Sequence, residues 1–408
     1  MYVQQPVSVP SVIVFILLAF LPSYWLPIVS HRPSSFVQWV LYFVVIIPSL
    51  IIPVLSLNMP FMLILLFSIT LLTGFFIISR THVLPIIKIP IPKIGPKAFF
   101  SVFLIIYMFF TFNLIRQFGF NINWVSILDV YDVRESYVEK LAEDSGYGVR
   151  WLMYIFNPFL IAIGYLQKKR RWMLYLGFLG ELMIYSTTGF KTALFIGLLI
   201  IFVLFFLDRF KSINQFPKFI AGGLVLMLVG VFIIDYLFFH NTIFLNDIFS
   251  SFTFRRNIVT PGYLSGQYFN YFWENPKIYM AGNKIISSVF GISNPYTERT
   301  AYIIGDYAFG RPGMAANANI WADAYSNFGF FGILIYSFIL FIYLLVYDSL
   351  SAKIDKRLSV AILIGPIVFF SNSALLTALL GHGAIWALII IYFYQYTARI
   401  TYNVETNS

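Results

Sequence analysis

Residues 60–79 read PFMLILLFSITLLTGFFIIS and contain no charged side chain. A helix needs about 20 consecutive apolar residues to cross the hydrocarbon core of a bilayer, and this stretch meets that requirement. The sequence therefore predicts an all-α protein, a polytopic bundle of about eleven transmembrane helices that forms a single integral membrane domain over residues 1–408. The other expected spans are residues 11–29, 36–57, 98–117, 150–167, 172–188, 191–207, 217–238, 328–348, 358–378 and 383–399.

The composition of the chain excludes an ordinary soluble domain. Hydrophobic residues make up 60% of the sequence and charged residues only 11%, whereas soluble domains have about 25% charged residues. With so few charges, lipid must cover much of the surface, and we expect membrane lipids as partners. The 46 Phe, 27 Tyr and 8 Trp residues are typical of lipid-facing helices with aromatic belts at the interfaces.

The sequence contains no cysteine and only four scattered histidines. Without thiols, disulfides, thiolate catalysis and cysteine-bound zinc are excluded, and the spread of the histidines argues against a His-rich metal site. We therefore expect neither a metal nor a cofactor. The net charge of +10 is divided among short basic clusters between apolar stretches. Because they form no continuous patch, we expect no nucleic-acid partner.

The basic clusters also predict the orientation of the chain, because loops rich in Lys and Arg stay in the cytoplasm. The strongest signal is the run of four cations from Lys168 to Arg171. If the spans alternate from that loop, the other dense basic loops share its side, the C-terminus is cytoplasmic and the N-terminus lies outside. Two long outer loops follow, residues 118–149 and 239–327. The first apolar stretch lacks a basic n-region and a cleavage site, so we expect a retained span.

The outer loop 239–327 concentrates positive charge where loops usually carry little. Arginine suits phosphate because its planar guanidinium is permanently charged and can donate two parallel hydrogen bonds. A cluster just above the bilayer would therefore suit a lipid-linked diphosphate. The alternative is that these side chains reach lipid head groups or pair with Glu274, Glu298 and Asp306. The cations are Arg255, Arg256, Lys277, Lys284, Arg299 and Arg311.

Within this loop, Thr260 and Pro261 are typical of an N-cap and a first helical position, and Asn275-Pro276 would end the helix. Its many aromatic residues indicate a helix lying at the membrane interface. Two of them, Tyr263 and Trp273, are also candidates for stacking on sugars, with interface anchoring as the alternative.

Residues 317–332 read NANIWADAYSNFGFFG and predict a polar helix start that enters the membrane. The spacing of Gly329 and Gly332 would permit close packing against another helix. Asp323 is the best-placed carboxylate for a general base at the membrane edge, although capping the helix or pairing with a loop Arg would explain it equally well. Asn317 and Asn319 are candidate substrate ligands.

Isolated charges within or near spans are costly and therefore candidates for function. Glu181 lies inside the expected span 172–188. Lys191 follows a tight turn at Thr188-Gly189 that would direct its ammonium group to the outer face, where it could bind an anion or serve as an anchor. His382, in the last outer turn, could carry a proton or simply be a loop residue.

Together these features resemble the Wzy-type oligosaccharide repeat-unit polymerases of bacteria and, more distantly, the O-antigen ligases. Arg255 and Gly266 match the Arg-x10-Gly pattern of the polymerase loops. Asn319, nine intervening residues and Gly329-x-x-Gly332 are similar to the ligase pattern His-Asn-x9-Gly-x-x-Gly. Two further matches are Thr188-Gly189-Phe190-Lys191, which looks like the Ser/Thr-Gly-x-Arg/Lys turn, and the aromatic-Asn-Pro segment 271–276.

The sequence departs from these patterns at two positions. Ala318 occupies the ligase histidine position, so a histidine base cannot be carried over to it. In the first outer loop, Arg134 misses the Arg-x10-Gly spacing to Gly146 by one residue, which makes Arg134 a weaker candidate for substrate binding than Arg255.

The resemblance implies a metal-independent glycosyltransferase of the C-type membrane fold, with a large helical extracytoplasmic loop, in the bacterial cytoplasmic (inner) membrane. It would join undecaprenyl-diphosphate-linked repeat units into O-antigen or capsular polysaccharide, alongside a chain-length regulator and a flippase. Arg255, Arg256 and Arg311 would stabilise the departing diphosphate and Asp323 would be the base. The expected substrate-binding residues are Lys191, Arg299, Lys284, Arg134, Asn317, Asn319, Tyr263 and Trp273.

Two other functions remain open. One is a polysaccharide or lipid transporter or flippase, which would place charges near the bilayer midplane; Glu181 is the residue that would fit it. The other is an O-antigen ligase, which moves finished polymer to a lipid anchor, and Ala318 in place of histidine argues against it.

Overall fold

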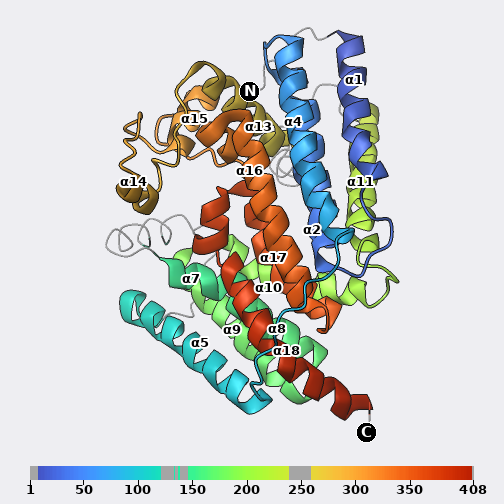
Figure 1. Ribbon diagram of the computed structural model, residues 1–408, viewed down its shortest axis with the longest axis vertical. Coiled ribbons are helices and arrows are strands. Elements are labelled where there is room, and N and C mark those ends of the chain that lie inside the picture. Colours follow the sequence, from blue (N-terminus) through green and yellow to red (C-terminus); the bar gives the residue numbers. More distant parts are fainter. Residues whose placement is uncertain (1–7, 121–132, 134–136, 138–145, 239–258, 407–408) are drawn as a thin grey trace.

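Every secondary-structure element in the described part of the chain is helical, which confirms the all-α class (Figure 1). The computed structural model describes residues 8–120, 133, 137, 146–238 and 259–406. In part of residues 224–238, at 284–285 and from residue 399 onward it describes the backbone only. The α-helices are α1 (Val9–Phe20), α2 (Pro33–Leu41), α3 (Ile47–Ser56), α4 (Phe61–Ser79), α5 (Pro96–Phe118), α7 (Tyr147–Trp151), α8 (Asn157–Leu166), α9 (Arg171–Thr188), α10 (Lys191–Leu207), α11 (Gln215–Phe238), α13 (Thr260–Glu274), α14 (Lys284–Phe290), α15 (Thr300–Phe309), α16 (Ile320–Ser351), α17 (Lys356–Asn372) and α18 (Ala384–Thr406).

Five helical segments of the described chain are long and apolar enough to cross a membrane, and they indicate a helical membrane protein. Each coincides with one of the expected spans. Three further apolar helices are shorter, Val9–Tyr24, Lys191–Leu207 and Ala384–Ala398. The total of eleven spans stays a prediction. The five long segments are Pro33–Ser56, Phe61–His82, Pro96–Phe118, Tyr147–Leu166 and Ile320–Ser351.

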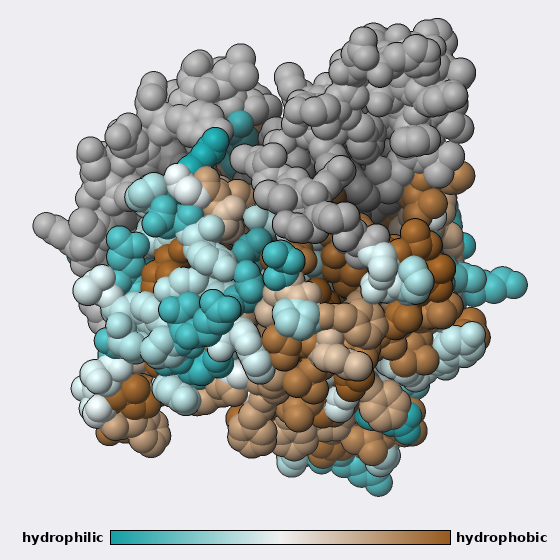
Figure 2. Space-filling model, turned by 90° about the horizontal axis from the view of Figure 1, so that it is seen from above, coloured by the Kyte–Doolittle hydropathy of each residue, from teal (hydrophilic) through white to brown (hydrophobic). Residues whose placement is uncertain are grey.

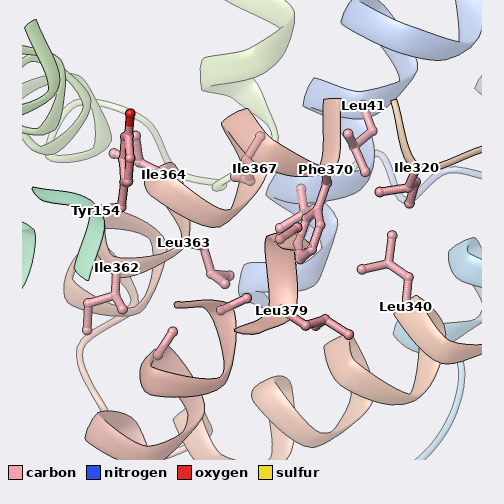
Figure 3. Packing of buried hydrophobic residues seen from close by; sticks show 14 of the residues in the cluster. Leu41, Tyr154, Ile320, Leu340, Ile362, Leu363, Ile364, Ile367, Phe370 and Leu379 are labelled. Atoms are coloured by element: carbon pink, nitrogen blue, oxygen red, sulfur yellow. The ribbon is translucent and has the colours of Figure 1, made fainter. Parts of the chain in front are cut away.

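Helix α17 is buried among the other helices. In Figure 3 its side chains lie between Tyr154 on one side and Leu41 and Leu340 on the other. A Cβ atom at Gly365 would lie 2.4 Å from the main-chain oxygen of Tyr154. The missing side chain therefore lets α17 lie against the π-helical turn Leu152–Phe156, which is how small residues commonly bring membrane helices together.

Helix α13 packs inside the protein, contrary to the expectation of an interfacial helix. Its aromatic residues Tyr268, Phe269 and Phe272 are buried. A Cβ at Gly262 would lie 2.5 Å from the main-chain oxygen of Pro48, and one at Gly266 would lie 3.0 Å from Pro53. These two glycines let α13 lie directly on α3. Thr260 is already inside the helix, because Val259 before it has helical dihedral angles.

A kink at Phe328 and Gly329 divides helix α16 into two segments. Gly329 has a positive φ of 63° and a ψ of −145°. A Cβ at Gly332 would lie 2.1 Å from the main-chain oxygen of Ala324. The two glycines thus allow the short segment of α16 before the kink to lie closely against the start of the long segment after it. They do not create the contact with a separate helix that the sequence had indicated. The short first segment of α16, residues 320–327, carries Asp323.

The described part of the segment expected as the large outer loop contains several helices joined by turns and irregular stretches. Residues 259–327 contain α13, α14, α15 and the start of α16, which lie at one end of the molecule (Figure 1). The C-terminal part of α18 lies at the other end. Most of the expected first outer loop, 118–149, falls outside the described residues.

Candidate functional site

A cavity of about 450 Å³ lies where α13, α15 and the short first segment of α16 meet. Figure 2 looks down on this end of the molecule and shows hydrophilic residues gathered on one side, opposite an apolar side. Three of the site residues predicted from the sequence line the cavity together, Arg299, Asn317 and Asp323. The polar and charged side chains of the lining are Asn283, Asn294, Thr297, Glu298, Arg299, Thr300, Asn317, Asp323, Asn327 and Thr377, with the phenol of Tyr268.

Asp323 lies in the first turn of α16 and faces this cavity. The Nδ2 atom of Asn327, one turn later, donates to the Asp323 carboxylate at 3.3 Å and to its main-chain oxygen at 2.9 Å. Burial, together with the negative charge of Asp323, raises the pKa of the Tyr268 phenol. Among the described residues, Asp323 has no ion pair, so the pairing alternative gains no support there.

The kink in α16 shapes the wall of the cavity below Asp323. It leaves the main-chain oxygens of Ser326 and Asn327 to accept from the amides of Ile278 and Tyr279, at 3.0 and 3.2 Å. The Oδ1 atom of Asn327 accepts from the amide of Met280 at 2.8 Å. Tyr279 and Met280 both have positive φ, 51° and 66°. Non-glycine residues rarely adopt this conformation, and such strain clusters at functional sites.

Arg299, the one cation of the described lining, lies between Glu298 and the start of α15. Arg299 is the residue before the first turn of α15, and Thr300 and Ala301 of that turn also line the cavity. The N-terminus of a helix carries a partial positive charge and unpaired amide groups, which favour anions. Arg299 is exposed and forms no ion pair in the described chain, so its guanidinium is available to an anionic ligand.

Asn319 holds the site together from outside the cavity. It is 1% exposed, and its Oδ1 accepts from the amides of Trp321 and Ala322 as the N-cap of α16. Its Nδ2 donates to the hydroxyl of Ser265 on α13 at 2.7 Å, and that hydroxyl lies 2.8 Å from Ser49 on α3. The geometry therefore gives Asn319 a positioning role, because no ligand in the cavity can reach it.

Lys277 serves the fold rather than the cavity. Its ammonium group donates to the main-chain oxygen of Phe272, in the last turn of α13, and lies 5.2 Å from the centre of the Tyr325 ring. Burial lowers its pKa. A cation at a helix C-terminus compensates the partial negative charge there.

Four other candidates lie away from the cavity. Tyr263 is buried and donates to the main-chain oxygen of Ala308, and Trp273 is 43% exposed beside Phe330. Arg311 is exposed after the end of α15, and Lys191 begins α10. For Lys284 the backbone alone is described, and Arg134, Arg255 and Arg256 lie outside the described residues.

Sequence reasoning missed Asn283, Asn327 and Thr377 in the lining. Asn327 belongs to the stretch that predicted Asp323, four residues after it, so helical periodicity could have placed the two side chains together. Thr377 follows α17 in a π-helical turn, and nothing in its sequence context connects it with residue 323.

A second polar group lies between α5, α8 and α9. Glu181 and Asn157 are 2% and 0% exposed, and the Asn157 amide is placed to hydrogen-bond to the Glu181 carboxyl group. A Cβ at Gly180 would lie 2.5 Å from Asn157 Oδ1 and 2.6 Å from the Tyr107 hydroxyl, so Gly180 makes room for these groups. A buried carboxyl group with no ion pair in the described chain is costly and is therefore a candidate for function.

A comparison of the chain with known protein families, with curated proteins and with solved structures finds no significant match.

Proposed function

We propose that the protein polymerises lipid-linked oligosaccharide repeat units by glycosyl transfer, with a polyprenyl diphosphate as leaving group, at the outer face of the bacterial cytoplasmic membrane. The observation that carries the proposal is a cavity lined by amides, hydroxyls and carboxylates, with Asp323 and Arg299 in one lining. Sugars offer many hydroxyl groups, which side chains of these kinds bind as donors and acceptors. The motifs shared with the repeat-unit polymerases support the same reaction.

The reaction requires one proton acceptor and a means of neutralising the leaving group. The hydroxyl oxygen of the acceptor sugar attacks the anomeric carbon of the donor, and its proton passes to the Asp323 carboxylate. The bond from the anomeric carbon to the diphosphate oxygen breaks, and the diphosphate leaves with the electron pair. Arg299 and the N-terminal amides of α15 offset its growing negative charge, because preorganised donors act most strongly where charge develops.

Deletion of the gene tests the reaction class. Glycans are separated on a gel from a strain without the protein and from one in which the protein has been restored. Loss of a polymerase leaves single repeat units attached to their anchor, loss of a ligase leaves none, and an unchanged ladder contradicts both functions.

Replacing Arg299 by alanine is expected to lower polymer formation about ten- to hundredfold, since a hydrogen bond to a charged group contributes about 1.5–3 kcal/mol. Arg299→Lys should retain part of the activity. The polysaccharide ladder of the restored strain is the measurement, with the amount of protein in the membrane measured in parallel. Lys97→Ala, at an exposed cation in the first turn of α5, is the control. A normal ladder in Arg299→Ala would remove this residue from the proposal.

The buried Glu181 favours a second candidate function, a polysaccharide or lipid transporter. A transporter should lose its activity in Glu181→Gln, because its charged groups near the midplane carry the transport step. If the protein is a transferase that works at the cavity of Asp323, Glu181→Gln should leave the ladder intact. Tyr175→Phe, at an exposed position of the same helix, controls for general effects on α9. Loss of all polymer in Glu181→Gln, at normal protein level, would favour the transporter.

A further inference from the structure

A basic recess lies at the opposite end of α16 from the cavity of Asp323. Its volume is about 340 Å³, and its lining includes residues 354–357, which connect α16 to the first turn of α17. Lys211, Lys356 and Arg357 line it together with His31 and a single carboxylate, Asp355.

The recess carries uncompensated positive charge. Arg357 is bound on two sides, by Asp208 at 2.5 Å and by Asp355 at 2.6 Å. Lys211 and Lys356 are exposed and have no ion pair within the described chain. The two acidic residues are therefore used by one arginine, and two ammonium groups remain to attract an anion.

A separate apolar groove lies along two helices that also reach the recess, α10 and α17. It has a volume of about 210 Å³ and is lined by side chains of α2, α10, α11 and α17, among them Val40, Leu199, Phe202 and Ile364. Val203 of the groove and Leu207 of the recess are one turn apart on α10. On α17, Arg357 and Ile364 are separated by about 10 Å at 1.5 Å per residue.

The cationic recess and the apolar groove both lie along α10 and α17, and we call this pair of sites the seam. A charged site beside an apolar one matches an amphipathic ligand. We propose that this seam binds one phospholipid with an anionic head group, with the phosphate in the recess and an acyl chain in the groove. Basic pockets between membrane helices commonly hold such head groups. A free phosphate ion would leave the groove without a ligand, and a neutral lipid would leave Lys211 and Lys356 uncompensated. The site is independent of the proposed glycosyl transfer.

Native mass spectrometry of the purified full-length protein tests this proposal, with added phosphatidylglycerol, phosphatidylcholine or inorganic phosphate as probes. We expect phosphatidylglycerol to bind in preference to phosphatidylcholine. Each of Lys211→Ala and Lys356→Ala should weaken phosphatidylglycerol binding about fivefold. Leu199→Trp, which fills the groove from a position that is 41% exposed, should weaken binding of this lipid without affecting the two lysines.

The control is Lys168→Ala with Lys169→Ala, two exposed lysines outside the recess. Equal binding of the two lipids by the unmodified protein would overturn the proposal. So would an equal loss in the control, or displacement of phosphatidylglycerol by inorganic phosphate at matched concentration. The last result would show that the recess binds phosphate alone.

Discussion

Asp323→Asn is expected to lower polysaccharide formation about 10²- to 10⁴-fold, the range that a positioned general base contributes. The amide has nearly the shape of the carboxylate and can keep its contact with Asn327, but it cannot accept the proton of an attacking hydroxyl group. Single repeat units should therefore accumulate on the gel in place of the ladder. The carboxylate faces the cavity and has no ion pair among the described residues, so the loss should come from chemistry rather than from an unfolded protein.

Two further variants separate chemistry from charge. Asp323→Glu keeps a carboxylate in a displaced position and should retain part of the activity. Asp306→Asn removes an exposed carboxylate from α15 that does not line the cavity, and should give a normal ladder. If Asp323→Asn forms the full ladder at normal protein level, Asp323 is not the base, and the proposed reaction needs another proton acceptor.

The second large effect is expected at the kink of α16, where Gly329→Ala should lower the melting temperature and abolish polymer formation. The φ of 63° and ψ of −145° at Gly329 lie in a region that is essentially open to glycine alone. An added side chain costs about 1–3 kcal/mol there. To relieve that strain, α16 would straighten, and the segment 320–327 would then carry Asp323 out of the cavity wall.

Gly332→Ala should act in the same direction, because its Cβ would lie 2.1 Å from the main-chain oxygen of Ala324. Gly222→Ala in α11 is the matched control, since no atom lies within 4 Å of the Cβ it would add. Alanine is also the better helix former, so the control should be as stable as the parent or slightly more stable. Thermal unfolding of the purified proteins in detergent measures all three variants. An unchanged melting temperature in Gly329→Ala would show that the kink is not essential.

The positions of helices followed from the sequence because both lipid exposure and burial require apolar residues. The stretches 36–57, 60–79, 98–117, 150–167 and 328–348 were recognised by length and hydropathy, which are local properties. Local pattern was less informative within α13. The same aromatic residues suit the interface and the protein interior, and only the contacts of Gly262 and Gly266 with α3 distinguish the two.

For the candidate site, the sequence by itself determined which residue types are present: a carboxylate at the polar start of a helix, and cations in the segment before it. The tertiary structure decided which of them meet. Arg299 and Asp323 share one lining because α15 and the short first segment of α16 converge there, whereas Arg311 and Lys191 do not line the cavity. Spacing along the chain cannot predict this, because the kink at Gly329 and the packing of α13 on α3 set distances between residues far apart in sequence.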